Sequence, residues 1–395
     1  TVYARAHIGN ARPFVVGMWL RSWLRLRGYD ARLVHNITDV NDKIYDAAPG
    51  ASAELAAHAT EWYLQDIGDF GLGMPDHLPK ATEYIEQIET FIAKLIEREF
   101  AYEVDGDVYF RVSRSEGYGR LSGQKPDQVE DQEPNPRKED PRDFALWKAN
   151  KPGEDTWWDS PWGRGRPGWH IECSVMAEEL LGPVFEIHGG GLDLVFPHHE
   201  NELAQSNALG HDFAQIWAHN GMLRFVGEKM SKSSGNVTTM REALDEWGAE
   251  TLLLFFMTAH WRKPIDFSQE TLASAKAQAD GFREVFRNPS SPAPAGAWET
   301  FAAALDDDFN TPDALAVLHS WRDHDLLRRA LDVFGLAGLA DDVSAPAEIH
   351  KLAEQRQAAR VAKDFAQADR LRDELAAAGW VARDVEGGFQ LVPKQ

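Results

Sequence analysis

The sequence has 395 residues, of which 43% are hydrophobic and 26% charged, and this length favours about two to four domains over a single core. No apolar run approaches the roughly 18–20 residues of a membrane-spanning helix, so we expect no membrane partner. The first residues, TVYARAHIGN, lack the pattern of a secretory signal, and the chain has one cysteine. These features exclude an internal disulfide framework and predict a protein of the reducing cytoplasm.

The net charge of −22 argues against a general affinity for nucleic acid, because phosphate contacts need lysine and arginine. Basic residues nevertheless gather locally, and a local patch can bind a polyanion on an acidic protein. The alternative is that each cluster is a solvated helix face. The clusters are Arg21, Arg25, Arg27 and Arg32; Arg137 and Lys138; and Arg356, Arg360, Lys363, Arg370 and Arg372.

The first half of the chain predicts a helix and strand pattern followed by an insertion. Residues 11–27 have apolar side chains at helical spacing and end before Gly28, and residues 31–40 predict a strand that runs into a polar loop. This order is typical of a parallel sheet with crossover helices. Residues 51–100 are mostly helical. A hairpin is expected around Asp105 and Gly106, before a polar, proline-rich loop at 122–143.

From Pro167 the α/β pattern resumes, with predicted helices at 169–181, 198–209 and 239–248 and strands at 183–189 and 216–223. The chain is then helical from about 268 to 335, except for the connector 291–296, and again from 347 to 379, before a terminal hairpin. The domains predicted from this order are 1–75 and 166–267, the two halves of a catalytic domain; 76–165, a connective insertion; 268–340, a helical bundle; and 345–395, a small C-terminal domain.

The segment GEKMSKSSGN, residues 227–236, places Lys229 and Lys232 in a loop with glycine at both ends. Glycine and serine permit a mobile loop, and the two ammonium groups could neutralise charge that develops on a polyphosphate. Thr239 and Glu242 predict a capping box for the next helix. The alternative is an exposed basic turn.

The segment AHIGNAR, residues 6–12, places His7 and Gly9 just before a predicted helix. A helix N-terminus offers free N–H groups and positive potential to an anion. Gly9 would let a flat ring approach the backbone, and His7 could donate to a phosphoryl oxygen. Alone, this pattern is also that of an ordinary surface histidine.

The single cysteine, Cys173, lies on a predicted helix one turn after Trp169. Further along the chain, His198 and Glu202 are spaced i and i+4, as in zinc-binding helices, and Pro197 suits a first helical turn. Three zinc-competent side chains with an open position are typical of a working metal site. The alternative is a small buried cysteine and an unrelated pair on a helix surface.

The early HIGN and the late KMSKS, on either side of alternating strands and helices, resemble the two signatures of class I aminoacyl-tRNA synthetases, with Asn10 where the first signature usually has histidine. PGWHIECS, HGGGLDL, FPHHENE and NITDVNDK together are similar to cysteinyl-tRNA synthetases over nearly the whole chain. The resemblance implies an α/β fold with a Rossmann-type parallel-sheet catalytic domain and a connective insertion, followed by an α-helical tRNA-binding region and a small C-terminal domain. It also implies activation of L-cysteine with ATP and its transfer to tRNA-Cys.

The resemblance further implies roles for individual residues. One zinc ion is expected on Cys173, His198 and Glu202, with a fourth ligand from a family cysteine that would lie two residues before Thr1, so we expect a longer natural chain. Zinc would select the substrate thiol over a hydroxyl without an editing site. A monomer is expected, and ATP is expected with Mg²⁺. The expected cysteine-binding residues are Thr38, Trp169 and His188; the expected ATP-binding residues are His7, Gly9, Asn10, Gly190, Gly191, Asp193, Lys229 and Lys232, with His7, Asn10, Lys229 and Lys232 catalytic.

Two other functions fit parts of the sequence. The ligase of mycothiol synthesis shares the expected fold, zinc site and cysteine activation but passes cysteine to an amino sugar; the run RQAARVAKDFAQADRLRDEL resembles the synthetase and ranks this function lower. A non-catalytic, synthetase-like tRNA-binding protein is the other, because Asn10 departs from the usual signature and the N-terminus is short.

Overall fold

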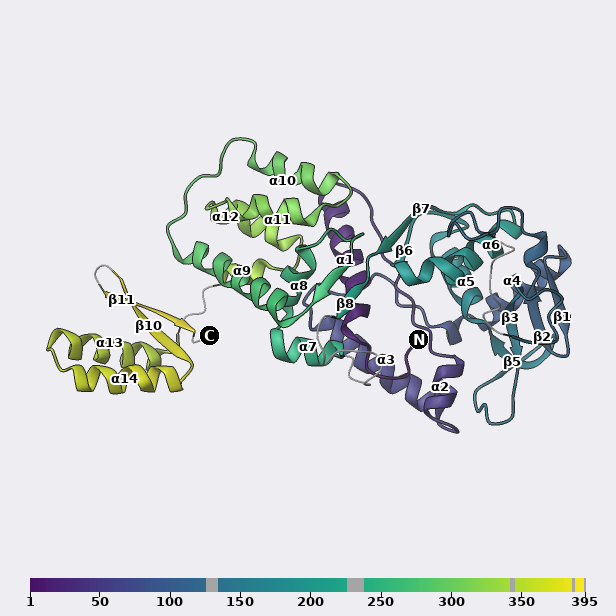
Figure 1. Cartoon of the computed structure of the whole chain (residues 1–395), viewed down its shortest axis with the longest axis horizontal. Coiled ribbons are helices and arrows are strands. Elements are labelled where there is room, and N and C mark those ends of the chain that lie inside the picture. Colours follow the sequence, from purple (N-terminus) through teal and green to yellow (C-terminus); the bar gives the residue numbers. More distant parts are fainter. Residues whose placement is uncertain (126–133, 226–237, 342–344, 386–387, 394–395) are drawn as a thin grey trace.

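The computed structural model describes residues 1–125, 134–225, 238–341, 345–385 and 388–393. Figure 1 shows an elongated molecule with a small C-terminal unit at one end and the predicted insertion at the other, and with a helical and α/β region between them. None of the described helices is long and apolar enough to cross a membrane.

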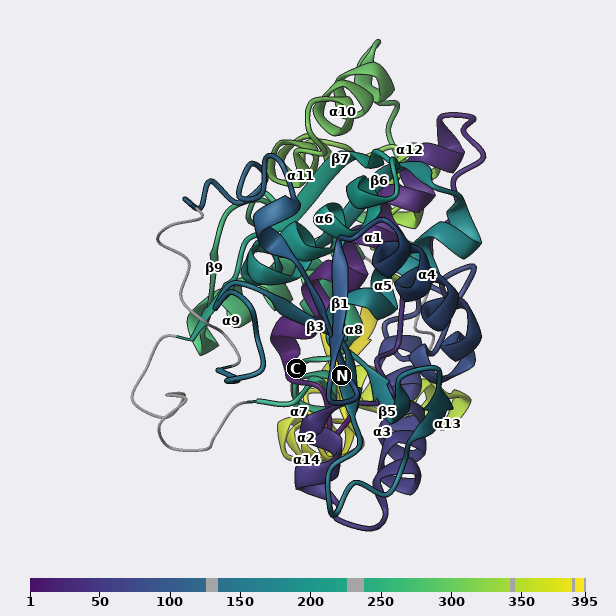
Figure 2. The ribbon, with the colours of Figure 1, turned by 90° about the vertical axis from the view of Figure 1, so that its right-hand side faces the viewer.

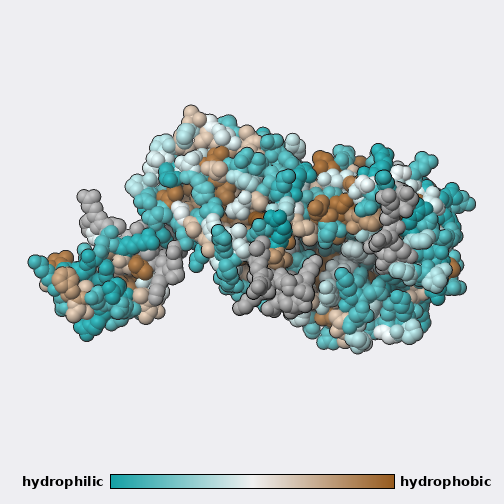
Figure 3. Space-filling view, viewed as in Figure 1, coloured by the Kyte–Doolittle hydropathy of each residue, from teal (hydrophilic) through white to brown (hydrophobic). Residues whose placement is uncertain are grey.

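The α/β part is built on α1 (Ala11–Leu26) and two pairs of parallel strands. The helix buries Phe14, Trp19 and Trp23, so the predicted helix at 11–27 is confirmed. One pair is β6 (Val184–Gly191) with β7 (Phe213–Asn220), and the other is β8 (Leu223–Phe225) with β9 (Ile265–Phe267). Figure 3 shows apolar side chains over β6 and β7, where Val184 and Ile216 are exposed.

The strand expected at 31–40 is not a regular strand, and that prediction is wrong in detail. The segment is extended but makes only two isolated parallel bridges, Val34 with His77 and Ile37 with Lys80. Pro79 lies between these two partners and has no N–H to donate, so the ladder is interrupted there.

The insertion contains an antiparallel sheet of order β1-β2-β3-β5-β4. The predicted hairpin is confirmed: Asp105 and Gly106 have φ of 51° and 85°, as the tight turn between β1 and β2 requires. In Figure 2 the insertion faces the viewer, and α4 and α5 lie beside its sheet. The elements are α2 (Asp42–Ala47), α3 (Ser52–Gly68), α4 (Ile85–Glu97), β1 (Ala101–Val104), β2 (Asp107–Phe110), β3 (Phe144–Ala149), β4 (Trp158–Ser160), β5 (Gly163–Pro167) and α5 (Trp169–Leu181).

The helix predicted at 198–209 begins later as a regular α-helix, because α6 spans Glu200–Ala208. It is preceded by the 3-10 turn η5 (Leu192–Leu194) and the wider turn η6 (Val195–His199), in which Phe196 is not helical, with φ −137° and ψ 133°. His198 therefore enters the site from a turn and not from the body of the helix.

The following helices pack on α1. Trp19 Nε1 donates to the Phe334 carbonyl at 3.0 Å, and one apolar core includes α1 and the helices up to residue 339. The C-terminal unit has its own small core around Ile349 and Leu375. The predicted domain boundaries remain predictions. The elements are α7 (Met240–Trp247), α8 (Ala249–Met257), α9 (Gln269–Arg287), α10 (Ala297–Asp306), α11 (Thr311–His319), α12 (His324–Asp332), α13 (Ala347–Val361), α14 (Phe365–Ala377), β10 (Trp380–Val385) and β11 (Gly388–Pro393).

Candidate active site

Three side chains from separate elements meet at the base of the site: Cys173 on α5, His198 on η6 and Glu202 on α6. All three are buried, and their ligand atoms lie within 4.8 Å of one another. His198 Nε2 is 3.6 Å from Glu202 Oε1. A tetrahedral zinc ion with bonds of about 2.0–2.3 Å holds its ligand atoms roughly 3.5 Å apart, so sulfur, nitrogen and oxygen donors at this spacing fit zinc.

The electrostatics of these three residues also favour a bound divalent metal ion. Burial raises the pKa of the Cys173 thiol well above its usual value, and the nearby Glu202 and Glu172 add to this. Burial also raises the pKa of Glu202, but His188 and His198 outweigh it and the net shift is downward. Burial lowers the pKa of His198 to about 3, so its imidazole is neutral and available to a metal. A buried carboxylate and a neutral imidazole beside a thiol can be balanced by a divalent cation that ionises the thiol.

The residues expected to line the cysteine pocket surround this group. The Trp169 ring stacks on His198, with centroids 4.2 Å apart. Thr38 is buried and lies beside the Glu172 carboxyl. His188 Nε2 is 3.0 Å from Glu202 Oε2, so it orients a candidate metal ligand directly.

Sequence reasoning missed several polar residues that contact the ligands or the histidines beside them. His170 Nδ1 is 3.0 Å from His198 Nδ1, and Asn36 Nδ2 donates to Cys173 Sγ at 3.3 Å. His199 Nδ1 is 2.8 Å from His219 Nε2. His170 and His199 each adjoin a residue that the sequence did single out, and this adjacency was the available signal; for Asn36 and His219 there was none.

A second group of metal-competent side chains shares Glu202. His188, His199 and Glu202 also place their ligand atoms within 4.8 Å of one another. His188 is less buried than the other two, and this group has no sulfur donor. Because thiolate is a preferred zinc ligand and all three residues of the first group are buried, the group with Cys173 suits zinc better than the second group.

The HIGN segment forms a short turn at the start of α1. His7 Nδ1 accepts a hydrogen bond from the Gly9 backbone N–H at 2.9 Å. A Cβ atom at Gly9 would lie 2.4 Å from His7 Cε1, so a larger residue here would displace the His7 ring from its place over the turn. Asn10 is exposed, and its side chain makes no capping bond to α1.

The HIGN region is joined through the backbone to the residues that follow the second signature segment. Ile8 N donates to the Thr238 carbonyl at 3.1 Å, and Met240 N donates to the Ala6 carbonyl at 2.7 Å. The predicted capping box is confirmed, with Glu242 N bonded to Thr239 Oγ1 at 3.1 Å. Lys229 and Lys232 lie outside the described residues, but the chain that follows them is attached to the HIGN turn.

The glycine run lies at the carboxyl ends of β6 and β7, the edge where parallel sheets bind ligands. A Cβ atom at Gly190 would lie 3.0 Å from the His199 ring, and one at Gly191 would lie 2.3 Å from Asp193 Oδ1. Asp193 is exposed at this edge. The glycines therefore let the backbone pass close to the site without displacing the His199 and Asp193 side chains.

Parallel strands with an HIGN turn and a glycine run at one edge define the fold of a class I aminoacyl-tRNA synthetase. The methionyl-tRNA synthetase of Mycobacterium tuberculosis in complex with methionyl-adenylate superposes with a TM-score of 0.61, covering 85% of this chain and 86% of that one at 14% identity. A putative arginyl-tRNA synthetase of Campylobacter jejuni gives 0.54 over 88% and 85%, at 15% identity. These likenesses show the fold alone.

Sequence comparison narrows the class to one family. Residues 1–277 match the model of the tRNA synthetases class I (C) catalytic domain, residues 300–324 a DALR domain, and residues 342–391 a cysteinyl-tRNA ligase anticodon binding domain. The Cysteine--tRNA ligase of Azotobacter vinelandii is 43% identical over 98% of this chain and 92% of the relative, and that of Thioalkalivibrio sulfidiphilus is 44% identical over the same shares. The chain belongs to the cysteine–tRNA ligase family.

Proposed function

We propose that this chain activates L-cysteine with ATP to cysteinyl-adenylate and transfers the cysteinyl group to tRNA-Cys. The observation that carries the proposal is the buried meeting of Cys173, His198 and Glu202 beneath Trp169, inside a fold of this family. One of the three side chains, Cys173, is itself a thiol, and sulfur donors suit a soft metal that would also bind the substrate thiol.

Zinc is the cofactor that these residues would hold, one ion on Cys173, His198 and Glu202. When bound, it supplies a soft Lewis acid that prefers a thiolate to a hydroxyl. Trp169 forms a wall of the pocket, and His188 keeps Glu202 oriented from behind. The fourth ligand expected upstream of Thr1 remains a prediction.

On the ATP-binding side of the site, the residues assist the reaction by positioning the substrates and by stabilising charge. The substrate carboxylate is the nucleophile on the α-phosphorus, so the chain needs no covalent intermediate of its own. His7 and Asn10 contact the phosphates at the start of α1, and the glycine run with Asp193 lies along the nucleotide. Lys229 and Lys232, with Mg²⁺, stabilise the charge that develops on the α-phosphate and the pyrophosphate. The supporting observation is that Thr238 and Met240, which follow the second signature in the chain, are hydrogen-bonded to Ile8 and Ala6 of the first signature region.

The tRNA would lie along the helical region and the C-terminal unit, whose match is to an anticodon binding domain. We propose that the protein acts as a monomer in the cytoplasm, where a reducing environment keeps both the Cys173 thiol and the substrate thiol free.

Cysteine-dependent exchange between ATP and pyrophosphate, followed by charging of tRNA-Cys, tests the proposal. Exchange with cysteine but not serine, and transfer to tRNA, are expected. Transfer of cysteine only to an amino sugar would support the mycothiol ligase instead. Absence of exchange would support the non-catalytic tRNA-binding protein.

A further inference from the structure

Arg12 is a buried cation that has no part in the mechanism proposed above. It is the second residue of α1, just after the HIGN turn, and it is 1% exposed. Among the described residues no carboxylate pairs with it, and burial lowers its pKa to about 10, so it stays charged at neutral pH. Burial without a counter-charge is costly, and the helix dipole disfavours a cation in the first turn. Ion pairing therefore does not explain the presence of an arginine at this position.

The guanidinium group binds three backbone carbonyl groups instead. Arg12 Nη1 donates to Gly221 O at 2.6 Å and to Lys263 O at 2.7 Å, and Nη2 donates to His260 O at 3.0 Å. A planar guanidinium can hold several acceptors at once because its donors have a fixed geometry. Arg12 thus forms a junction between the start of α1, the residue after β7 and the loop before β9. We call this the Arg12 junction, and it consists of Arg12, Gly221, His260 and Lys263.

The Arg12 junction lies next to the edge where the nucleotide is expected. Gly221 directly follows β7, and Asn220, the last residue of that strand, pairs in register with Gly191. Asn220 Nδ2 also donates to the Gly190 carbonyl at 3.3 Å. Arg12 therefore connects the helix that follows the HIGN turn with the strand end that carries the glycine run.

The loop before β9 is held in place from its other side by the helical bundle. Trp261 Nε1 donates to the Asp308 carbonyl at 2.8 Å, and Arg262 Nε is 2.6 Å from Asp308 Oδ2. The Trp261 carbonyl in turn accepts from Gly221 N at 2.8 Å. This loop is thus a support against which Arg12 holds the end of β7.

Gly221 allows two backbone segments to approach each other closely in the junction. A Cβ atom at this position would lie 2.3 Å from the carbonyl carbon and oxygen of Lys263 and 2.7 Å from Pro264 N. These are backbone atoms, so a larger residue would have to move the strand end or the loop. The carbonyl groups that Arg12 binds are therefore held in one arrangement, and a site ordered in advance loses less entropy when it binds a ligand.

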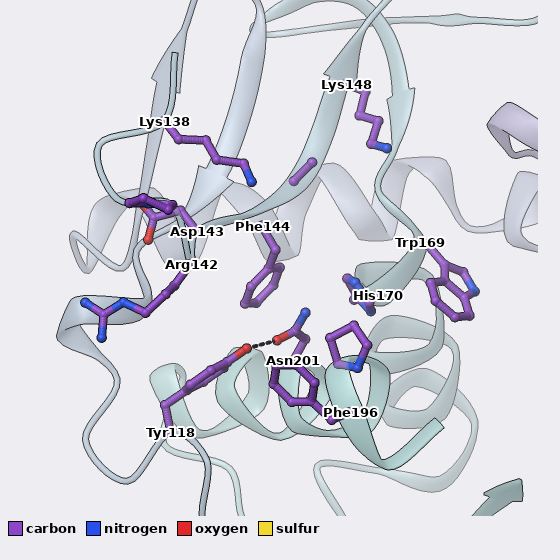
Figure 4. Close-up of a pocket in the computed structure, with 13 residues that line it drawn as sticks. Tyr118, Lys138, Arg142, Asp143, Phe144, Lys148, Trp169, His170, Phe196 and Asn201 are labelled. Carbon is purple, nitrogen blue, oxygen red and sulfur yellow. Dashed lines mark hydrogen bonds between the residues drawn. The ribbon is translucent and has the colours of Figure 1, made fainter. Parts of the chain in front are cut away.

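The Arg12 junction is separate from the amino-acid side of the site. Figure 4 shows Trp169 and His170 at a pocket on that side, and both residues contact the candidate zinc ligand His198. Neither Arg12 nor its three carbonyl partners line this pocket. A change at Arg12 should therefore leave the zinc and cysteine sites intact.

We propose that Arg12 is a positioning residue for ATP. Through the Gly221 carbonyl it fixes the end of β7, and with it the glycine run, relative to the HIGN turn at the start of α1. The two parts of the chain that are expected to contact the nucleotide are thereby held at one separation. This inference rests on the proposed function, and it adds a residue that acts on ATP through the backbone of others.

Arg12→Met tests the junction, because methionine fills similar space but offers no donor to the three carbonyl groups. In ATP–pyrophosphate exchange at saturating cysteine, we expect the KM for ATP to rise about tenfold, because misplaced binding groups lose affinity. The kcat should stay nearly unchanged, since binding lost equally in the ground state and the transition state appears in KM. The KM for cysteine and the zinc content should not change.

Arg12→Lys provides a second test if Arg12→Met folds poorly. An ammonium group has three donors but lacks the planar fork, so this variant should have a KM for ATP between those of Arg12→Met and the unsubstituted chain. The matched control is Arg21→Met. Arg21, on the same helix, also donates to a backbone carbonyl, that of Met74 at 2.8 Å, which lies outside the junction. Arg21→Met should lower thermal stability without raising the KM for ATP.

Two results would overturn the inference. The first is an unchanged KM for ATP in Arg12→Met or, should that variant not fold, in Arg12→Lys. The second is a rise in the KM for ATP and the KM for cysteine together, with the same pattern in Arg21→Met, which would make the role of Arg12 purely structural. Failure of the proposed function has a different signature, namely no cysteine-dependent exchange by the unsubstituted chain. Equilibrium dialysis with ATP would then still compare the affinities of Arg12→Met and the unsubstituted chain.

Discussion

The base and the rim of the candidate active site are built in opposite ways. At the base, Cys173, His198 and Glu202 are buried and come from adjoining elements with ordered neighbours. At the rim, Asn10 and Asp193 are exposed, and the expected Lys229 and Lys232 lie outside the described residues. Under the proposed function this difference separates two tasks: the base would distinguish one amino acid from similar ones, whereas the rim would bind a nucleotide whose charge changes during reaction.

The largest expected effect comes from the base. Cys173→Ser should lower zinc content and reduce kcat/KM for cysteine by at least about a hundredfold, since losing even an outer contact of a metal site costs roughly 10–100-fold. Metal analysis and ATP–pyrophosphate exchange measure both. Ser174→Ala, a change at the buried neighbour, is the control and should retain zinc. Full zinc content in Cys173→Ser would show that the metal lies elsewhere.

A change at the rim should act on rate alone. His7→Ala should lower kcat for cysteine activation by about a hundredfold, the usual cost of losing a donor to a developing charge, and should leave zinc content and the KM for cysteine unchanged. Steady-state exchange kinetics with metal analysis check this. Loss of zinc in His7→Ala would mean that base and rim are not separate.

A residue behind the base should have an intermediate effect. His188 contacts Glu202 Oε2 at 3.0 Å, so His188→Ala should weaken zinc binding by roughly tenfold through loss of orientation. Competition with a chelator measures the affinity. If cysteine affinity fell while zinc affinity did not, His188 would be a direct contact of the amino acid instead.

The smallest expected effect concerns the link between α2 and the insertion. Burial raises the pKa of Asp42, but Arg166 and Lys148 outweigh it and lower the value to about 2. Because the folded pKa lies below the unfolded value of about 3.9, the stabilisation is present above pH 4 and is lost as pH falls toward 2. Asp42 is partly solvated, so we expect Asp42→Asn to cost about 1 kcal/mol at pH 7.

Urea unfolding at pH 7 and pH 3 measures this effect, which should shrink at the lower pH. Asp46→Asn, at an exposed carboxylate of the same helix, is the control. An Asp42→Asn penalty that is equal at both values of pH would show that the carboxylate is not stabilised by its charge.

Local signals predicted local structure well. The turn at Asp105 and Gly106 and the capping box of Thr239 and Glu242 depend on neighbouring residues only, and both are present. The expected strand at 31–40 failed because its partner contains Pro79, which no local pattern in the strand itself reveals. The helix at 198–209 began late because the turn before it places Phe196 outside helical geometry.

The candidate site was predicted in part. The i, i+4 spacing brought His198 and Glu202 together, but only the resemblance joined them to Cys173, which lies on a helix separated from the turn of His198 by a strand and one other turn. Asn36 and His219 reach the site from distant segments through the packing of the chain, so their spacing in the sequence does not predict their contacts in the site. The roles of all these residues remain predictions until variants are measured.

The central claim is that a metal on Cys173, His198 and Glu202 selects the substrate thiol. The most direct measurement is the ratio of cysteine to serine kcat/KM in ATP–pyrophosphate exchange, before and after zinc is removed with a chelator. A ratio of about 10⁴ or more with zinc, and loss of cysteine activation without it, is the predicted result. Unchanged cysteine-dependent exchange in the zinc-free chain would contradict the claim.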